Sequence, residues 1–436
     1  MYNFTMNENN WAEKWSGDQI RVMLQEQFAS FWQRDTGIRR AQLATVQRSG
    51  GSPHAVIISG LRRVGKSTLL AQLAHILGEE TFYYVNFEDE RFLGFHGSDA
   101  NALFAALVRS FGERKTFLID EIQNIDGWEH FVRRFMDMGY KFYITGSNAS
   151  LLSRELGTRL TGRHISIELF PFSFPEFLAF RGETPGDPQQ WTTIEQARMQ
   201  SSLDAYLRLG GIPDALKYPE LPLLRNLYDD VLYRDIATRH RLDDVTTLKE
   251  LAFYLMSNPT APVSFNKLKG QFRIGSVNTI KSYIDYLADS WLLFTVHQYD
   301  FSLKRQQIAK KKVYPIDTGL AQAVGFQFSP NTGKFLESAI FLDLRRQTEN
   351  LFYFATPGGF EVDFYLPEQR QLVQVAQHLD NPSTRQREIR ALQDAIGSIP
   401  VQSALILTDA NQDSFVIDGV PVDVRAVAEW MVGGGG

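Results

Sequence analysis

The chain has 436 residues, a hydrophobic content of 44%, a charged content of 22% and a formal net charge of -5. That composition is typical of an ordinary globular protein with about two to four domains, and it excludes a uniformly basic protein of the chromatin type. Because the chain has no cysteine, disulfides, thiolate zinc sites and cysteine nucleophiles are excluded as well. No apolar run approaches the length of a membrane span and the first residues lack the pattern of a signal peptide, so we expect a cytoplasmic protein without membrane contact.

Residues 1–53 are the first predicted segment, a helical N-terminal extension. Its apolar residues recur at helical spacing, and they are Ile20, Met23, Leu24, Phe28, Phe31, Trp32, Ile38, Leu43 and Val46. The glycines and proline of residues 50–53 then break the pattern. We therefore expect helices that pack on the core that follows.

A glycine-bounded loop at residues 60–67 follows an apolar run at residues 55–58 and precedes a helical pattern that starts at Thr68. Strand, loop and helix in this order predict a phosphate-binding loop for ATP, because the loop N–H groups and the helix N-terminus together favour an anion. Lys66 would reach the β- and γ-phosphates, and the Ser67 hydroxyl would ligate Mg²⁺. The alternative is an ordinary glycine-rich turn. The residues expected to contact the nucleotide here are Gly60, Arg62, Arg63, Val64, Gly65, Lys66, Ser67 and Thr68.

Two acids end the apolar run at residues 115–119. Paired acids at a strand end fit a metal-bound nucleotide: Asp120 would hold Mg²⁺ together with Ser67, and Glu121 would orient or deprotonate the attacking water. The alternative is a strand that merely ends in solvated acids.

A third apolar run, residues 141–144, ends in polar residues, of which Ser147 is the first candidate for a sensor that positions the water. Asn148 and Thr145 are the runners-up, and the alternative is a polar loop that only turns the chain. Because strands and helices alternate over residues 54–175, we predict a parallel α/β sheet. The strand-end motifs then meet at one edge of that sheet.

Residues 176–262 read as a mostly helical section, interrupted by Gly210, Gly211, Ile212 and Pro213. Residues 263–325 read as helix, turn, helix and a two-stranded wing, which is a winged-helix arrangement. The wing carries five cations and no acid, so we expect contact with the phosphate backbone of DNA. Alternatively the module packs against protein, and its lysines protect a sheet edge. The cations are Lys304, Arg305, Lys310, Lys311 and Lys312.

Residues 326–432 read as an α/β section with polar residues at three places. Glu337 lies on a predicted helix, Asp363 on a hairpin strand and Gln374 on the next strand. Together they outline a metal site of the restriction-endonuclease type.

The motifs from residue 60 to about residue 408 together resemble bacterial AAA+/STAND-like P-loop ATPases fused to a C-terminal PD-(D/E)XK-nuclease-like domain. The fold class expected from this resemblance is α/β: a P-loop parallel-sheet ATPase core with a helical lid, a winged helix and a restriction-endonuclease-like α/β domain. It further implies that a lid carrying Pro213 covers the adenine, and that Arg163, with Arg159 as runner-up, reaches the γ-phosphate of a neighbouring subunit. Such an arginine requires a homo-oligomer, for example a hexameric ring; alternatively it pairs within its own subunit.

The nuclease pattern is incomplete in this sequence. Gln374 stands where the family has its second acid, and Ala376 stands where it has a lysine. The lysines at residues 310–312 fall in the predicted winged helix, so we do not expect them to substitute. Glu337, Asp363 and Gln374 are therefore predicted to be a vestigial site that does not cleave.

The leading functional hypothesis is an ATP-hydrolysing oligomeric motor or clamp on branched or duplex DNA, with ATP and Mg²⁺ as cofactors. The second is a STAND-like switch whose nucleotide state controls assembly with a protein partner. The third is an ATP-dependent DNA nuclease.

Overall fold

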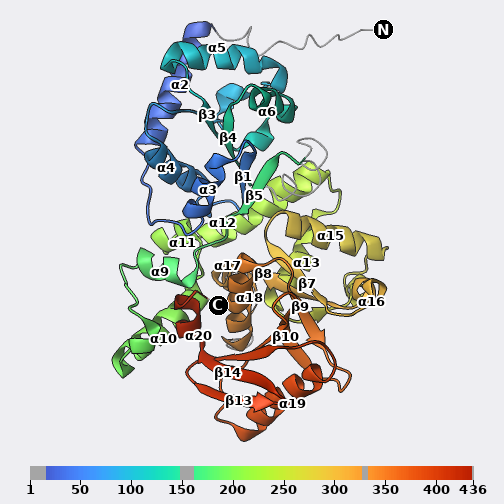
Figure 1. Ribbon diagram of the computed structural model, residues 1–436. Coiled ribbons are helices and arrows are strands. Elements are labelled where there is room, and N and C mark those ends of the chain that lie inside the picture. Colours follow the sequence, from blue (N-terminus) through green and yellow to red (C-terminus); the bar gives the residue numbers. More distant parts are fainter. Residues whose placement is uncertain (1–15, 148–161, 327–331, 435–436) are drawn as a thin grey trace. The chain divides into compact units, whose positions relative to one another are not determined.

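The computed structural model describes residues 16–147, 162–326 and 332–434, which fall into two compact units, Met1–Leu169 and Phe170–Gly436. Each unit has its own β-sheet (Figure 1). The predicted α/β class is confirmed, with a parallel sheet in the first unit and a mixed, mostly antiparallel sheet in the second. No helix within the described ranges is long and apolar enough to cross a membrane.

The first unit is built on a five-stranded parallel sheet in the order β2-β3-β4-β1-β5. Its strands are β1 (Ala55–Ser59), β2 (Phe82–Asn86), β3 (Thr116–Asp120), β4 (Lys141–Gly146) and β5 (His164–Glu168). Parallel neighbours need crossovers, and three of them contain α4 (Lys66–Leu77), α5 (Ala100–Phe111) and α6 (Trp128–Asp137). Since β4 pairs with both β1 and β3, its carboxyl end lies between the carboxyl ends of those two strands.

The N-terminal extension forms two helices, α2 (Gly17–Trp32) and α3 (Leu43–Arg48). A capping box at Ser16 and Gln19 begins α2, which satisfies two backbone donors at the helix start. The buried face of α2 includes the predicted residues Ile20, Met23, Leu24, Phe28 and Phe31. It packs on β2 and α5, while the segment between the two helices reaches the glycine-bounded loop described below.

Helices make up the first part of the second unit: α9 (Phe174–Phe180), α10 (Thr193–Leu209), α11 (Pro213–Lys217), α12 (Leu223–Asp230) and α13 (Val245–Ser257). Capping boxes at Ser173 and Thr192 begin α9 and α10. A π-helical stretch, Val231–Thr238, continues α12. This part agrees with the predicted helical section.

The second unit also holds a nine-stranded sheet in the order β13-β14-β12-β11-β10-β9-β7-β8-β6. The strands are β6 (Pro262–Val263), β7 (Leu293–Gln298), β8 (Lys311–Pro315), β9 (Phe352–Ala355), β10 (Glu361–Leu366), β11 (Gln371–Val375), β12 (Ser403–Thr408), β13 (Asp413–Ile417) and β14 (Val420–Ala426). The remaining helices are α14 (Phe265–Gln271), α15 (Val277–Asp289), α16 (Leu303–Ile308), α17 (Thr318–Val324), α18 (Thr332–Gln347), α19 (Pro382–Ile396) and α20 (Val427–Val432).

The predicted wing differs from the structure in two respects. The connection between β7 and β8 is not a plain hairpin turn, because it contains the short helix α16. In addition, β7 pairs in parallel with β9, at His297 with Phe352 and at Gln298 with Tyr353. One sheet therefore joins the predicted winged-helix section to the predicted nuclease-like section.

Asp317 connects two segments of the second unit that are distant in sequence. It is buried, and its carboxylate accepts the N–H of Gly211 at 2.6 Å and that of Leu320, in the first turn of α17, at 2.8 Å. Burial raises the pKa of Asp317 to about 6, although N–H donors at Gly211, Leu320 and Gly319 oppose that rise. Asp317 thus caps α17 and fixes the glycine-containing break before α11.

Replacing Asp317 by alanine should lower the free energy of unfolding by about 3 kcal/mol or more, because buried N–H donors are left without an acceptor. The folded-state pKa lies above the ordinary 3.8, so the carboxyl stabilises the fold most at low pH and loses that contribution as pH rises through about 6. The loss should thus be larger near pH 4 than near pH 7. Denaturant unfolding of the parent and of Asp317→Ala at the two pH values measures this loss, with the exposed Asp243→Ala as control. Equal stability of the parent and Asp317→Ala would contradict the capping role.

Candidate nucleotide-binding site

The loop between β1 and α4 is held by its own lysine. Lys66 opens α4 and is 5% exposed, and its ammonium donates to the carbonyls of Gly60 and Leu61 at 3.0 Å each. Gly65 has φ 96°, a left-handed conformation that glycine adopts without strain. At Gly60 a Cβ would lie 2.2 Å from the carbonyl oxygen of Leu169, so only glycine fits. The loop is therefore curled tightly around the start of α4.

An arginine that sequence reasoning missed supports this loop from the N-terminal extension. Arg40 is buried, and its guanidinium donates to the carbonyl of Val64 at 2.7 Å. Its backbone N–H donates to Gln72 of α4 at 3.2 Å. Nothing in the polar stretch around Arg40 indicates such a role, because the contact depends on how the extension folds back.

Asp120 is buried at the carboxyl end of β3, among hydroxyl groups. The hydroxyls of Ser67 and Thr145 hydrogen-bond its carboxylate, and the Tyr84 hydroxyl donates to Oδ2 at 3.3 Å. Burial raises the pKa of Asp120, while the bonds from Ser67 and Thr145 oppose the rise. A carboxylate beside a serine hydroxyl is an oxygen donor set of the kind that Mg²⁺ takes, so these residues fit that ion.

Glu121 follows Asp120 in a left-handed conformation with φ 54°. Its Oε1 lies 4.0 Å from the ammonium of Lys66, and its N–H donates to Thr145 at 3.1 Å. Gln123 donates to the Glu121 carboxylate and, at 3.2 Å, to the hydroxyl of Ser147. Glu121, Gln123 and Ser147 thus form one hydrogen-bonded chain, of which the sequence suggested only the two ends.

Other predicted residues of this site have different surroundings. Arg62 lies 4.0 Å from Glu88, and Arg63 has φ 64°. Arg163 ends the segment before β5 and pairs with Asp137 of the same unit. Arg159 and Asn148 lie outside the described residues. Pro213 begins α11 in the second unit, and its contact with a nucleotide stays a prediction.

Arg163 lies at the amino ends of the sheet strands, whereas the loop follows the carboxyl end of β1. β5 runs parallel to β1 with His164 beside Ala55 and Glu168 beside Ser59. Five strand residues at about 3.3 Å each separate the two edges by roughly 16 Å. Arg163 is therefore distant from the phosphate loop of its own chain.

The first unit matches a known family. Residues 52–178 match an AAA domain, and residues 200–331 match a domain of unknown function, DUF8612. The uncharacterised protein MJ1544 of Methanocaldococcus jannaschii is 33% identical over 375 residues, which cover 82% of this chain and 82% of that protein. The chain belongs to the family of MJ1544. Its first unit accordingly contains a P-loop core of the AAA type.

Further similar proteins are more distant. An uncharacterised Haemophilus influenzae protein is 29% identical over 397 residues, 86% of this chain and 94% of that protein. Among solved structures, the Walker-type ATPase paby2304 of Pyrococcus abyssi is 13% identical with a TM-score of 0.42, covering 67% of this chain and 99% of that one.

The prediction that Lys312 contacts DNA is wrong. Lys312 was expected to contact DNA from a separate module, but its side chain is 2% exposed. Successive strand residues point to opposite faces, and on β8 Lys312 and Tyr314 share the face that meets Glu337 of α18. The ammonium lies 3.0 Å from Glu337, 2.7 Å from Glu361 and 3.0 Å from Asp363. Lys312 therefore belongs to the carboxylate cluster and not to a DNA-binding surface.

The cluster opens into a cavity of about 760 Å³. Burial, followed by the charge of Asp363, raises the pKa of Glu337 to about 7, although Lys312 opposes that rise. Gln374 lines the same cavity but turns its amide to Glu388 at 2.8 Å. The three predicted residues Glu337, Asp363 and Gln374 thus converge, and Lys312 joins them.

The other wing cations differ among themselves. Lys304 and Lys310 are exposed, and Arg305 is exposed while pairing with Asp300 at 2.9 Å. Lys311 is half-buried over the ring of Phe265, and burial lowers its pKa. Three of the five predicted cations therefore offer charge at the surface.

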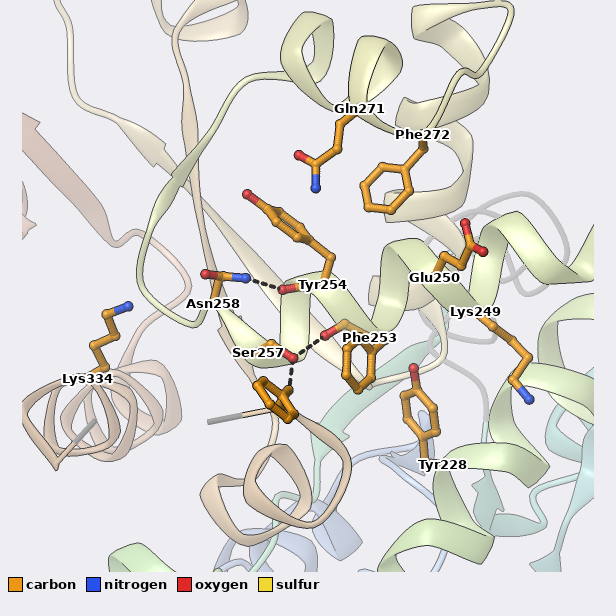
Figure 2. Close-up of a pocket in the computed structure, with 11 residues that line it drawn as sticks. Tyr228, Lys249, Glu250, Phe253, Tyr254, Ser257, Asn258, Gln271, Phe272 and Lys334 are labelled. Atoms are coloured by element: carbon orange, nitrogen blue, oxygen red, sulfur yellow. Dashed lines mark hydrogen bonds between the residues drawn. The ribbon is translucent and has the colours of Figure 1, made fainter. Parts of the chain in front are cut away.

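A second cavity of about 780 Å³ lies between helices of the second unit, and five of its eleven lining residues are aromatic (Figure 2). Phe253 and Phe326 are 43% and 57% exposed. The buried Tyr228 hydroxyl has no hydrogen-bond partner in the described part of the chain. Figure 2 shows Tyr254 and Phe272 on another side of this cavity. No pattern in the sequence indicated this cavity.

Proposed function

We propose that the chain is an ATP-hydrolysing protein that works as a homo-oligomeric motor or clamp on DNA. The observation that carries the proposal is the convergence of Lys66, Asp120 and Glu121 at one sheet edge within an AAA domain. Bound Mg²⁺ would supply positive charge to the phosphates and would be held by Ser67 and Asp120.

The other residues near the carboxyl ends of β3 and β4 would act on the water that attacks the γ-phosphate. Glu121 would orient the attacking water or accept its proton, and Gln123 would fix the position of the Glu121 carboxylate. Ser147 holds Gln123 from the end of β4. In this proposal the Lys66 ammonium leaves the loop carbonyls of Gly60 and Leu61 and binds phosphate.

The oligomer is proposed from the position of Arg163. An arginine at the edge opposite to its own loop cannot serve that loop, but it can serve a neighbouring subunit whose loop faces it. Its ion pair with Asp137 is half-exposed on both sides, and such pairs are weak enough to exchange for a phosphate. A ring, for example of six subunits, would satisfy each site in this way.

DNA is proposed as the partner because α13, β6, α14, α15, β7 and β8 follow one another in the winged-helix order. The connection between β7 and β8 carries the exposed cations Lys304, Arg305 and Lys310. Cations of this kind can pair with phosphates without reading sequence. Pro213 and the break before α11 would belong to a lid over the adenine.

The test is the ATPase rate with single-stranded, duplex and four-way-junction DNA, together with DNA affinity as a function of salt. We expect stimulation by at least one DNA form. The variant Lys304→Ala/Lys310→Ala should bind more weakly and reduce the slope of log affinity against log salt by about 2. Lys115→Ala/Lys217→Ala removes the same charge from other exposed positions and should leave the slope unchanged. If no DNA form stimulates the ATPase rate and the protein does not bind DNA at low salt, the DNA proposal is wrong.

The aromatic cavity in Figure 2 favours a second candidate, the STAND-like switch that binds a protein partner. Exposed aromatic side chains in a hollow are common at protein interfaces. This candidate predicts no response to DNA, slow turnover and a different assembly size with ADP than with an ATP analogue. Sizing chromatography in the same two nucleotide states therefore separates it from the leading proposal.

A further inference from the structure

The carboxylate cluster of the second unit resembles a metal site by its residue types, since a nuclease-like domain implies a divalent ion between Glu337 and Asp363. The structure permits a test of that fit. Among the described residues, no group of three or more His, Asp or Glu side chains is arranged to hold a metal ion. The reason lies in the position of Lys312.

The ammonium of Lys312 lies at the centre of the cluster. An ammonium has three N–H donors, and three carboxylates lie within 3.0 Å of Nζ: those of Glu337, Glu361 and Asp363. Each carboxylate thus takes one short, charge-assisted contact. The positive charge lies where a shared cation would have to lie.

Two further hydrogen bonds hold the carboxylates of Asp363 and Glu337 in place. Oδ2 of Asp363 accepts the N–H of Val375 at 3.0 Å, and Oε1 of Glu337 accepts the Tyr314 hydroxyl at 2.8 Å as well as Lys312. Gln374, at the place of a second acid, donates its amide to Glu388. An amide brings no negative charge to offset a divalent ion.

Electrostatics disfavour a divalent ion at the position that the Lys312 ammonium occupies. Burial by itself lowers the pKa of Lys312, but Tyr314, Asp363, Glu337 and Glu361 together raise it well above its ordinary value. The surrounding carboxylates therefore favour the charged form of Lys312. A divalent ion placed among the same carboxylates would meet this positive charge at close range in a poorly solvated place, where repulsion is strong.

We infer that Lys312 is the built-in cation of this cluster, an ammonium in the position of a divalent metal. The cavity beside it therefore takes no Mg²⁺ or Mn²⁺ and does not cleave DNA by a metal-dependent route. The cluster instead joins β8, α18 and β10, from which Lys312, Glu337 and Asp363 come. This goes beyond the proposed ATPase, which uses other residues in the other unit.

The experiment is a titration of the full chain with Mn²⁺ in the absence of nucleotide. Calorimetry measures Mn²⁺ binding, and the unfolding temperature is measured with and without Mn²⁺. All proteins carry Asp120→Asn, which removes the carboxylate expected to hold metal at the nucleotide site. We expect this parent protein to show no Mn²⁺ binding that depends on Asp363. Adding Lys312→Met, a neutral side chain of similar length, should create a Mn²⁺ site and a Mn²⁺-dependent rise in unfolding temperature. Adding Asp363→Asn to Lys312→Met should abolish both gains.

Two results would overturn the inference. One is a Mn²⁺ site in the parent protein that disappears with Asp363→Asn alone, and the other is a folded Lys312→Met protein that gains no Mn²⁺ binding. If Lys312→Met does not fold, the comparison of the parent with its Asp363→Asn variant still decides, because both retain the lysine. A failure of the proposed ATPase would appear in nucleotide turnover and would leave these titrations unchanged.

Discussion

Replacing Lys66 by alanine is expected to reduce ATP turnover by at least about 100-fold, the loss typical when one donor to transition-state charge is removed. The ammonium is buried and lies 3.0 Å from the loop carbonyls of Gly60 and Leu61, and in the proposed site it would neutralise phosphate charge. ATP affinity should also fall, because a hydrogen bond to a charged group is lost. Phosphate release and fluorescent-nucleotide titration measure the two effects.

The matched control for Lys66 is Lys115→Ala, an exposed lysine of the same unit at the amino end of β3. It removes the same charge at the far edge of the sheet and should leave turnover unchanged. The Lys66 variant also loses two hydrogen bonds inside the loop, so its unfolding temperature must be compared with that of the parent. A folded Lys66→Ala protein with normal turnover would show that the loop does not bind the transferred phosphate.

Replacing Glu121 by glutamine should slow hydrolysis by about 10²–10⁴-fold, the usual contribution of a general base, and leave ATP binding intact. The amide keeps the size of the side chain, so contact with Gln123 is retained while the proton acceptor is lost. Single-turnover experiments should then show ATP that stays bound and uncleaved. Normal hydrolysis would mean that Glu121 is not the base.

Glu113→Gln is the matched control for Glu121, because that acid is exposed and pairs with Lys115. Gln123→Ala is a further comparison: it leaves the carboxylate of Glu121 in place but removes the amide that hydrogen-bonds both Glu121 and Ser147. We expect a smaller loss of turnover than for Glu121→Gln, since the base remains and only its position is less fixed.

The sequence alone predicted the parallel core and the residues of its edge. This was possible because the phosphate loop is continuous in sequence, and because Asp120, Thr145 and Ser147 come at or directly after the ends of apolar strands. Carboxyl ends of parallel strands meet at one edge whatever the length of the connections. Hydrophobic pattern and strand direction therefore determined this part of the site.

Contacts between distant segments could not be predicted in the same way. Arg40 reaches the loop only because the N-terminal extension folds back onto α4, and Gln123 meets Ser147 because β3 and β4 are neighbours in the sheet. Strands β13 and β14 were missed as well; β14 alternates buried and exposed residues and lies between β12 and the edge strand β13. No local pattern in the chain reports such neighbours.

The predicted nuclease-like site shows the same division most clearly. The sequence by itself determined that Glu337, Asp363 and Gln374 share one region and that Ala376 supplies no lysine. Only the tertiary structure decided that Lys312 joins them, since this depends on β7 pairing with β9 and on which face of β8 the side chain takes. A shift of one residue along β8 would have turned Lys312 outward and Lys311 inward. The register of β8 thus decides whether Lys312 adds its positive charge to the cluster. The local sequence of β8 does not reveal that register.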